Sequence, residues 1–385
     1  MNNPFVYGEI AVGSAFIGRK KEVADLSQGL GSGERIFLIS PRRFGKTSLL
    51  ANLLEGFKGK GLLTAYIDLY RCASLEQFAS VFTDEVLVKA ETGFEAVARL
   101  VRGTIPLLRP KITLETDGQL SASLDLGRSQ NEQSAALSEL FNAAEKMAKR
   151  RNKRLVIAFD EFQEVATLGG EPLEKLMRAA FQTHHHVSYI FSGSRQHLIA
   201  DMVNNRDRAF YKMGRVVFLG KIADKDFQVF IAERFKSIGI VVGDAAFRRI
   251  LAATDAIPYY VQYLCSFLWN KCREGAKLTE EAVLETAAHI ADTQAPLYTG
   301  LLENIPLKQR RLLQVVAQNP GSKLYSREIA ERHKLGPLSS VQVSVGLLLK
   351  KGILEKENGG YVFSDPFLKI WVLMNHGVSH FKGAS

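Results

Sequence analysis

The sequence has 385 residues, of which 46% are hydrophobic and 23% charged, as is typical of a globular protein with two or three domains. No apolar run reaches the roughly 18 residues that a membrane-spanning helix needs. The three cysteines are too few and too scattered for a disulfide framework or a zinc site. The N-terminus lacks the pattern of a signal peptide. We therefore expect a cytoplasmic protein with no membrane partner.

The formal net charge is +10. Basic charge favours an acidic partner such as nucleic acid, although it also improves solubility. Residues 301–385 contain twelve Lys or Arg and six Asp or Glu, a net charge of 12 − 6 = +6. The last fifth of the chain therefore carries more than half of the excess charge.

The first half of the chain alternates between strand and helix patterns. Residues 1–14 are expected to form a loose N-terminal arm. Buried strands are predicted at 35–40, 63–69, 155–159, 187–191 and 216–219. Helices are predicted at 16–30, 47–54, 75–89, 134–151 and 173–184. Strands that alternate with helices predict right-handed crossovers and an α/β fold with a doubly wound parallel sheet.

A segment at about 91–130 interrupts this rhythm. The runs 111–116 and 120–126 alternate between apolar and polar residues around Asp117-Gly118, which predicts a β-hairpin inserted into the core. Its alternation indicates one buried face, which could pack locally or contact a partner.

The second half of the chain has a different organisation. Helices are predicted at 227–238, 244–254, 258–272 and 279–293, and a short linker near Gln294-Ala295-Pro296 ends this helical region. Three further helices, at 307–318, 326–333 and 339–350, precede two strands that flank Asn358-Gly359-Gly360. Three helices followed by a hairpin is the order of a winged helix.

The run Ser40–Ser48 has the composition of a phosphate-binding loop. A triphosphate is bound by backbone N–H groups, the amino end of a helix, a lysine and a hydroxyl that ligates Mg²⁺. Gly45 permits the turn before the helix, Lys46 would bridge the β- and γ-phosphates, and Thr47 would bind Mg²⁺. The usual pattern, G-x-x-x-x-G-K-S/T, has glycine where Ser40 stands. The predicted strand before the loop and helix after it favour this interpretation over a chance match.

A second motif ends the predicted strand at 155–159. The apolar run continues directly into Asp160 and Glu161, which places Asp160 at the carboxyl end of a core strand. There Asp160 could hold Mg²⁺ opposite Thr47, and Glu161 could polarise the attacking water. The alternative is an ordinary strand end followed by two solvated acids.

These motifs resemble those of the archaeal-type ATPases in the STAND branch of the AAA+ proteins, over nearly the whole chain. The segments that carry the resemblance are Phe16–Glu22 (F-x-G-R-x-x-E), Ile39–Leu49, Phe159–Gln163 (D-E-F-Q), Phe191–Ser194, Tyr211–Arg215 (Y-x-x-G-R) and Ile257–Tyr260. The resemblance implies a P-loop NTPase fold. Its parts would be an ATPase core at 15–220, a helical lid at 221–298 and a winged-helix domain at 299–385.

The resemblance also implies nucleotide contacts, with ATP or ADP and Mg²⁺ as cofactors. Phe16, Gly18 and Arg19 would border the adenine. Ser192 or Ser194, at the end of a strand, would sense the γ-phosphate. The residues expected to form the phosphate and metal site are Pro41, Arg42, Arg43, Phe44, Gly45, Lys46, Thr47, Ser48 and Asp160.

Two further elements are less specific. Arg215 is the candidate phosphate-facing, catalytic arginine, with a salt bridge at the rim of the core as the alternative. Arg206 and Arg208 compete for the same role or for a role in trans across an oligomer interface. Pro258 would belong to the lid segment that packs on the base, although this segment lacks the family's glycines.

The histidine tract 184–186 has no other ligand cluster near it in the sequence. We therefore interpret it as a solvated helix end and not as a metal site.

In the predicted winged helix, residues 339–350 would form the recognition helix, with Val341, Val345, Leu348 and Leu349 packed inward. The candidate contacts to double-stranded DNA are Ser339, Ser340, Gln342, Ser344, Lys350, Lys351 and Lys356. Winged helices also dock proteins, and no arginine lies in the recognition helix. Both kinds of partner therefore stay open.

The function expected from these features is an ATP-binding and hydrolysing molecular switch, with slow turnover, that couples nucleotide state to DNA binding or oligomer assembly. The alternative is a regulatory scaffold that keeps its nucleotide occluded and docks a protein partner through the winged helix.

Overall fold

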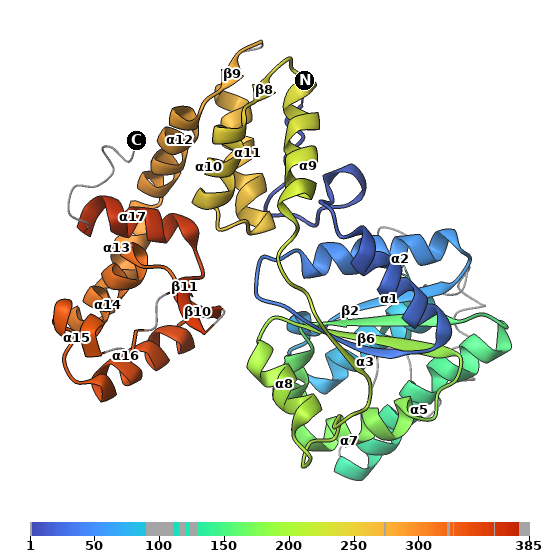
Figure 1. Cartoon of the computed structure of the whole chain (residues 1–385). Coiled ribbons are helices and arrows are strands. Elements are labelled where there is room, and N and C mark those ends of the chain that lie inside the picture. The colour runs from blue at the N-terminus through green and yellow to red at the C-terminus, as the bar shows by residue number, and fades with distance from the viewer. Residues whose placement is uncertain are drawn as a thin grey trace. The chain divides into compact units, whose positions relative to one another are not determined.

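The computed structural model describes residues 2–89, 111–114, 120–123, 129–272, 275–321, 324–325, 327–357 and 359–376, with the backbone alone for 111–114 and 120–123. The chain forms two compact units. One is Ile10–Gly220, and the other contains the described residues of Met1–Glu9 and Lys221–Ser385 (Figure 1). None of the described helices has the length and apolar character needed to cross a membrane.

A five-stranded sheet forms the centre of the unit Ile10–Gly220. Its strands are β1 (Arg35–Ile39), β2 (Leu63–Asp68), β5 (Leu155–Asp160), β6 (Val187–Gly193) and β7 (Arg215–Phe218). They lie in the order β2-β5-β6-β1-β7, and every neighbouring pair is parallel. The predicted α/β fold with a doubly wound parallel sheet is confirmed. The carboxyl ends of all five strands therefore meet at one edge.

Helices cover both faces of this sheet (Figure 1). α1 (Lys20–Ser32) and α2 (Lys46–Gly59) pack on one face through leucines such as Leu26 and Leu50. The opposite face is covered by α3 (Leu75–Thr83) with a π-helical turn (Asp84–Val88), α5 (Gln130–Arg150), α7 (Gly170–Phe181) and α8 (Gln196–Asn204). Side chains alternate between the two faces along each strand. Phe159 and Phe191 lie on this second face and stack there.

The predicted hairpin is confirmed where the structure describes it. β3 (Lys111–Leu114) pairs antiparallel with β4 (Leu120–Ser123), and Ile112 lies opposite Ala122. The predicted turn at Asp117-Gly118 and the preceding residues 91–110 lie outside the described residues.

In the other unit, the four predicted helices of the helical region are present as α9 (Asp224–Lys236), α10 (Asp244–Ala253), α11 (Pro258–Lys271) and α12 (Glu280–Thr293). A short parallel pair, β8 (Val241–Val242) and β9 (Lys277–Leu278), was not predicted from the sequence.

Part of the segment predicted as a loose arm is anchored in this unit. Phe5 is 4% exposed and lies among Phe230, Phe235 and Trp269. Asn3 donates from its side-chain amide to the backbone and hydroxyl oxygens of Ser266. An aromatic side chain that fills a pocket of other rings is strongly favoured over exposure, so the prediction of a loose segment is wrong for these residues.

The predicted winged helix is present. It consists of α14 (Leu307–Gln318), α15 (Arg327–Arg332), α16 (Leu338–Lys350) and an antiparallel pair, β10 (Leu354–Glu357) with β11 (Gly360–Phe363). The linker predicted near residue 295 is wrong, because α13 (Ala295–Glu303) begins there with a proline in its first turn, where the missing N–H has no helical partner. A final helix, α17 (Pro366–His376), was also not predicted.

Candidate active site

The loop between β1 and α2 has the backbone geometry of an anion site. Arg43 and Gly45 have positive φ angles of 66° and 81°, and Gly45 is the N-cap residue of α2. A Cβ added at Gly45 would meet no atom within 4 Å. Glycine is therefore favoured here by the backbone angle and not by crowding. The loop leads into a helix amino end, where N–H groups and the helix dipole favour a phosphate.

Asp160 ends β5 and lies beside this loop. Its side chain is 2% exposed, and its Oδ2 accepts hydrogen bonds from Thr47 Oγ1 at 2.8 Å and Tyr66 Oη at 3.0 Å. Its Oδ1 accepts from the backbone N–H of Glu161 at 3.0 Å. The Thr47 hydroxyl donates a hydrogen bond to Asp160. The lone pairs of the Thr47 oxygen are therefore available to another group. A hydroxyl and carboxylate in this arrangement fit a hydrated Mg²⁺ ion.

Glu161 lies in the left-handed region with φ 49°, which is uncommon for a residue other than glycine and often marks a functional position. Lys46 Nζ lies 3.6 Å from its Oε1. Its Oε2 accepts from Ser194 Oγ at 2.8 Å and from Gln163 Nε2. Burial raises the pKa of Glu161, but the Lys46 ammonium and these two hydrogen bonds outweigh it and hold the pKa below its usual range.

The two serines predicted to sense phosphate have different surroundings. Ser194 binds Glu161, as described above. Ser192 lies on β6 and is fully buried, and its Oγ has no hydrogen-bond partner among the described residues. An orphaned buried hydroxyl costs stability unless something satisfies it. Which of the two serines contacts phosphate stays a prediction.

Arg19 is a buried residue that bonds to the backbone of the loop. It has a φ of 63° and is 3% exposed. Its guanidinium donates to the carbonyl oxygens of Phe44 at 3.2 Å and Gly220 at 2.8 Å, and pairs with Glu22 at 3.0 Å. Burial lowers its pKa, and Glu22 opposes this shift. The hydrogen bonds from its guanidinium to Phe44 and Gly220 thus connect the loop to the last residue of the unit.

The remaining loop residues divide by exposure. Arg42 and Arg43 are exposed, Phe44 is buried, and Pro41 is half-buried. Ser48 accepts from the backbone N–H of Ala11 at 3.0 Å.

Phe16 packs against the core beside α1, and Gly18 has a φ of 58°. Pro258 begins α11 in the other unit, so its expected nucleotide contact stays a prediction.

The structure does not bring Arg215 to this edge of the sheet. Arg215 is the first residue of β7 and lies beside Ile36, so it is at the amino edge, opposite the loop that follows Ile39. It pairs there with Asp25 at 2.8 Å and Glu34 at 2.9 Å. The interpretation of Arg215 as facing the phosphates of its own chain is wrong, because the residue that starts a parallel strand lies at the opposite edge from the one that ends it.

The competing arginines also precede β7. Arg208 pairs with the buried Glu174 and with Asp201, and Arg206 is exposed. Neither arginine contacts Lys46, Asp160 or Glu161 in the hydrogen bonds and ion pairs of the described residues.

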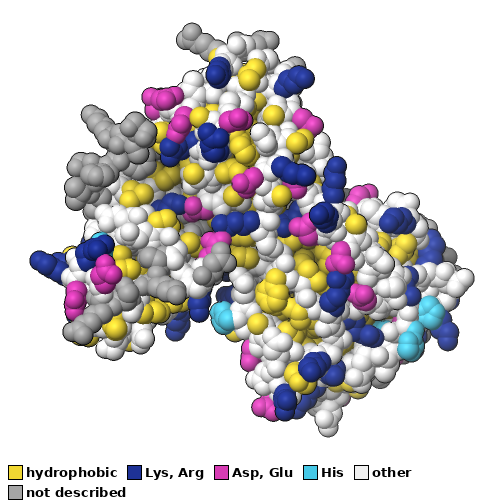
Figure 2. Space-filling view, viewed as in Figure 1, with side chains coloured by type: hydrophobic (Ala, Val, Ile, Leu, Met, Phe, Trp, Pro, Cys, Tyr) yellow, Lys and Arg dark blue, Asp and Glu magenta, His cyan; other side chains and the backbone are white. Residues whose placement is uncertain are grey.

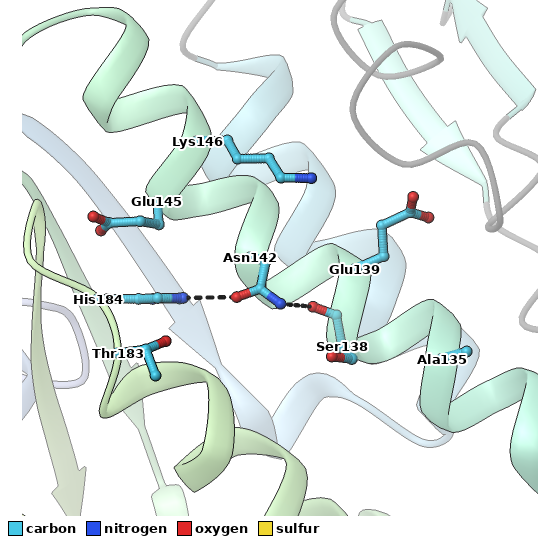
Figure 3. Close-up of a pocket in the computed structure, with 8 residues that line it drawn as sticks. All are labelled: Ala135, Ser138, Glu139, Asn142, Glu145, Lys146, Thr183 and His184. Carbon is cyan, nitrogen blue, oxygen red and sulfur yellow. Dashed lines mark hydrogen bonds between the residues drawn. The ribbon is translucent and has the colours of Figure 1, made fainter.

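The histidine tract lies at the same amino edge. His184 is 4% exposed; its Nδ1 bonds Tyr189 Oη at 2.6 Å and its Nε2 bonds Asn142 Oδ1 at 3.2 Å. The prediction of a solvated helix end is therefore wrong for His184. It borders an open cavity of about 560 Å³ between α5 and the start of β6, where Glu145 also lies (Figure 3). Within the described residues, no group of three or more His, Cys, Asp or Glu side chains is placed to hold a metal.

The recognition helix α16 exposes both polar and apolar side chains. Ser339, Gln342 and Lys350 are exposed, and Ser340 is half-buried. Val343 is 64% and Leu347 42% exposed on the same helix. Near the wing, Lys356 and Lys351 are exposed, and Lys351 Nζ donates to the carbonyl of Asn304 at 2.9 Å. On the face seen in Figure 2, basic side chains are interspersed with acidic ones and form no continuous area.

Comparison with known proteins places these features in a family. The family described as an ATPase domain predominantly from Archaea matches residues 16–264, more than half of the chain. The chain belongs to this family. A probable winged helix domain matches residues 296–374. The search of curated proteins found no match.

Solved structures support the fold of this archaeal-type ATPase. The Walker-type ATPase PABY2304 of Pyrococcus abyssi has a TM-score of 0.65 and 16% identity, covering 96% of this chain and 99% of that one. The ORC2 protein of Aeropyrum pernix, solved as ADPNP–ADP complexes, has a TM-score of 0.57 and 13% identity, covering 96% of each chain. At these identities the likeness shows the fold alone.

Two residues of the site were not identified from the sequence. Tyr66 lies in a strand whose alternating pattern predicts on which face of the sheet its side chain lies, but not which residue it contacts. Gln163 follows Glu161 by two residues and was noted only as part of a motif. The signal that could have found Tyr66 is the register of β2 beside β5, which places it on the same face as Asp160.

Proposed function

We propose that this archaeal-type ATPase binds Mg-ATP at the carboxyl edge of its sheet and hydrolyses it slowly to switch between conformations. The observation that carries the proposal is the convergence of Lys46, Thr47, Asp160 and Glu161, from α2 and β5, within hydrogen-bond or ion-pair distance of one another. Two motifs that matched their patterns only by chance would not be expected to bring these four side chains together.

Each group has a distinct proposed role. Lys46 would contact the phosphates, and Thr47 would ligate Mg²⁺ with Asp160 behind it. Bound Mg²⁺ would neutralise negative charge on the phosphates. Glu161 would polarise the attacking water, and the orphaned hydroxyl of Ser192 would contact the γ-phosphate.

Slow turnover is supported by the state of Glu161. Its two oxygens are engaged by Lys46, Ser194 and Gln163, and a carboxylate with a lowered pKa is a weaker base. Glu161 Oε1 has one described partner, the Lys46 ammonium at 3.6 Å, so it keeps a lone pair that can accept a hydrogen bond from water.

The test is phosphate release by Glu161→Gln. Glutamine keeps the size of the side chain but cannot act as a base, so turnover is expected to fall at least about 100-fold while nucleotide affinity stays within a few-fold. Glu164→Gln, three residues along and half-buried, is the matched control and should keep wild-type turnover. Unchanged turnover in Glu161→Gln would show that the assigned role is wrong.

The proposed output of this STAND-type switch is DNA binding or oligomer assembly, signalled through the winged helix. The net charge of +6 in residues 301–385 supports a DNA contact, which would use Ser339, Gln342, Lys350 and Lys356. Titration of labelled duplex DNA at several salt concentrations, with ADP and with a non-hydrolysable ATP analogue, tests it. A steep loss of affinity with salt is expected for phosphate contacts.

A second candidate is a nucleotide-occluded scaffold that docks a protein. The exposed Val343 and Leu347 on α16 favour it, because apolar side chains at the centre of a helix face suit a protein partner. Tightly bound ADP in the purified protein, together with no DNA binding at low salt, would support the scaffold over the DNA-coupled switch.

A further inference from the structure

Tyr66 is held in a position from which it reaches Asp160. It lies on β2 directly beside Ala158 of β5, and Asp68 lies beside Asp160. Side chains alternate along a strand, so Tyr66, Ala158 and Asp160 share one face of the sheet. The small Ala158 leaves room for the tyrosine ring to extend diagonally toward Asp160. The ring packs against the same core cluster as the leucines of α2.

The hydroxyl of Tyr66 completes the hydrogen bonding of one carboxylate oxygen. Asp160 Oδ2 accepts from Tyr66 Oη at 3.0 Å and from Thr47 Oγ1 at 2.8 Å. A carboxylate oxygen has two lone-pair directions, and these two donors use both. The backbone N–H of Glu161 holds Oδ1 at 3.0 Å. The carboxylate is thus fixed from three sides and cannot rotate without losing a bond.

Tyr66 donates in this contact under ordinary conditions. Burial raises the pKa of its phenol far above the usual value, and the charge of Asp160 raises it further. The phenol therefore keeps its proton, and the direction of the bond is settled. Loss of the donor would leave Oδ2 with Thr47 as its partner in this cluster, and the carboxylate would be held by two hydrogen bonds in place of three.

We propose that Tyr66 is a positioning residue for the magnesium site, and that it acts by fixing the Asp160 carboxylate that orients the Thr47 hydroxyl. The inference rests on the proposed function, because it assumes that Thr47 ligates Mg²⁺. Groups that orient a metal ligand from behind commonly change metal affinity by about 10- to 100-fold when removed. Tyr66 does not itself touch the nucleotide or the metal in this account.

The test measures ADP binding to the full chain by calorimetry, in EDTA and in excess Mg²⁺, for wild type and Tyr66→Phe. Phenylalanine keeps the ring that packs on α2 and removes only the donor. The gain in ADP affinity on adding Mg²⁺ is expected to fall about tenfold in Tyr66→Phe, whereas affinity in EDTA stays within about twofold. Tyr70→Phe, which changes a tyrosine that is 76% exposed after the same strand, should match the wild type in both conditions.

The possible outcomes separate the inference from the function on which it rests. An equal magnesium gain in wild type and Tyr66→Phe overturns the inference alone. A loss of affinity in EDTA as large as that in Mg²⁺ also overturns it, because the role would then be structural. A wild-type protein that binds ADP with no magnesium gain overturns the proposed magnesium site, and the inference with it.

Discussion

The two edges of the central sheet use their charged side chains differently. At the amino edge, Arg215 pairs with Asp25 and Glu34. This cation meets carboxylates of its own surroundings. Such contacts satisfy the Arg215 side chain within the protein.

The carboxyl edge has features that cost stability. Glu161 has a left-handed backbone, and the buried oxygens Ser192 Oγ and Gln163 Oε1 have no partner among the described residues. Lys46 and Asp160 are buried charges. Groups of this kind are retained at functional sites. The comparison teaches that buried charges and unsatisfied buried oxygens, among the described residues, separate the site from the rest of the sheet.

The largest expected effect is at the carboxyl edge. Lys46→Ala removes the buried ammonium that would contact the phosphates, and charge-assisted contacts of this kind are strong, so affinity for Mg-ATP is expected to fall roughly 100-fold. Calorimetry measures it. Arg215→Ala, at the amino edge, is the matched control and should bind nucleotide as the wild type does. A similar loss in both variants would remove the distinction between the edges.

The next effect is on stability, at the ion pair between Arg208 and Glu174. Arg208→Ala leaves Glu174, whose side chain is 1% exposed, without its charge partner. Breaking a buried ion pair typically costs about 3 to 5 kcal/mol of unfolding free energy; because Arg208 is 30% exposed, we expect the lower end of that range, about 3 kcal/mol. Denaturant unfolding measures it, and Arg208→Ala with Glu174→Gln should recover part of the loss. ATP turnover per folded molecule should not change; a large fall would assign Arg208 to the chemistry.

The smallest effect is a pH dependence from His184. Burial lowers the pKa of His184 to about 4 from an ordinary value of 6.5, although Glu145 opposes the shift. The unfolded chain therefore binds this proton more readily, and stability is complete above pH 6.5 and falls as pH drops toward 4. The loss is no more than about 3 kcal/mol.

Thermal unfolding from pH 7 to 4.5 measures this dependence. His184→Gln should flatten the curve over that range, because the variant has no buried imidazole to protonate. His185→Gln, which changes the exposed neighbour, should keep the slope of the wild type. The same slope in His184→Gln would show that other groups cause the acid sensitivity.

The sequence was most informative where a local pattern determines structure. Apolar runs predicted the strands of the parallel sheet, and Asn358-Gly359-Gly360 predicted the hairpin of the winged helix. The pattern was least informative at Pro296, where a proline that begins α13 was interpreted as part of a linker. Proline is favoured both in linkers and in the first turn of a helix, so composition alone does not separate the two.

The candidate site shows a similar limit. Lys46, Thr47, Asp160 and Glu161 were predicted because each motif fixes a position at a strand end or helix start. Arg215 was misplaced because the resemblance to a motif was followed, although a parallel strand at 216–219 already puts the residue before it at the amino edge. The contact from Tyr66 depends on the register of two strands and the small size of Ala158. Such relations arise only once the sheet is assembled.

The central claim is that nucleotide chemistry belongs to one edge of the sheet. Hydrogen–deuterium exchange with and without Mg²⁺ and a non-hydrolysable ATP analogue tests it most directly. The account predicts slower exchange on ligand addition at residues 41–48, 160–164 and 192–196, and no change at 150–154 and 183–186. Protection confined to the amino-edge segments, with none in the loop that contains Lys46, would contradict it.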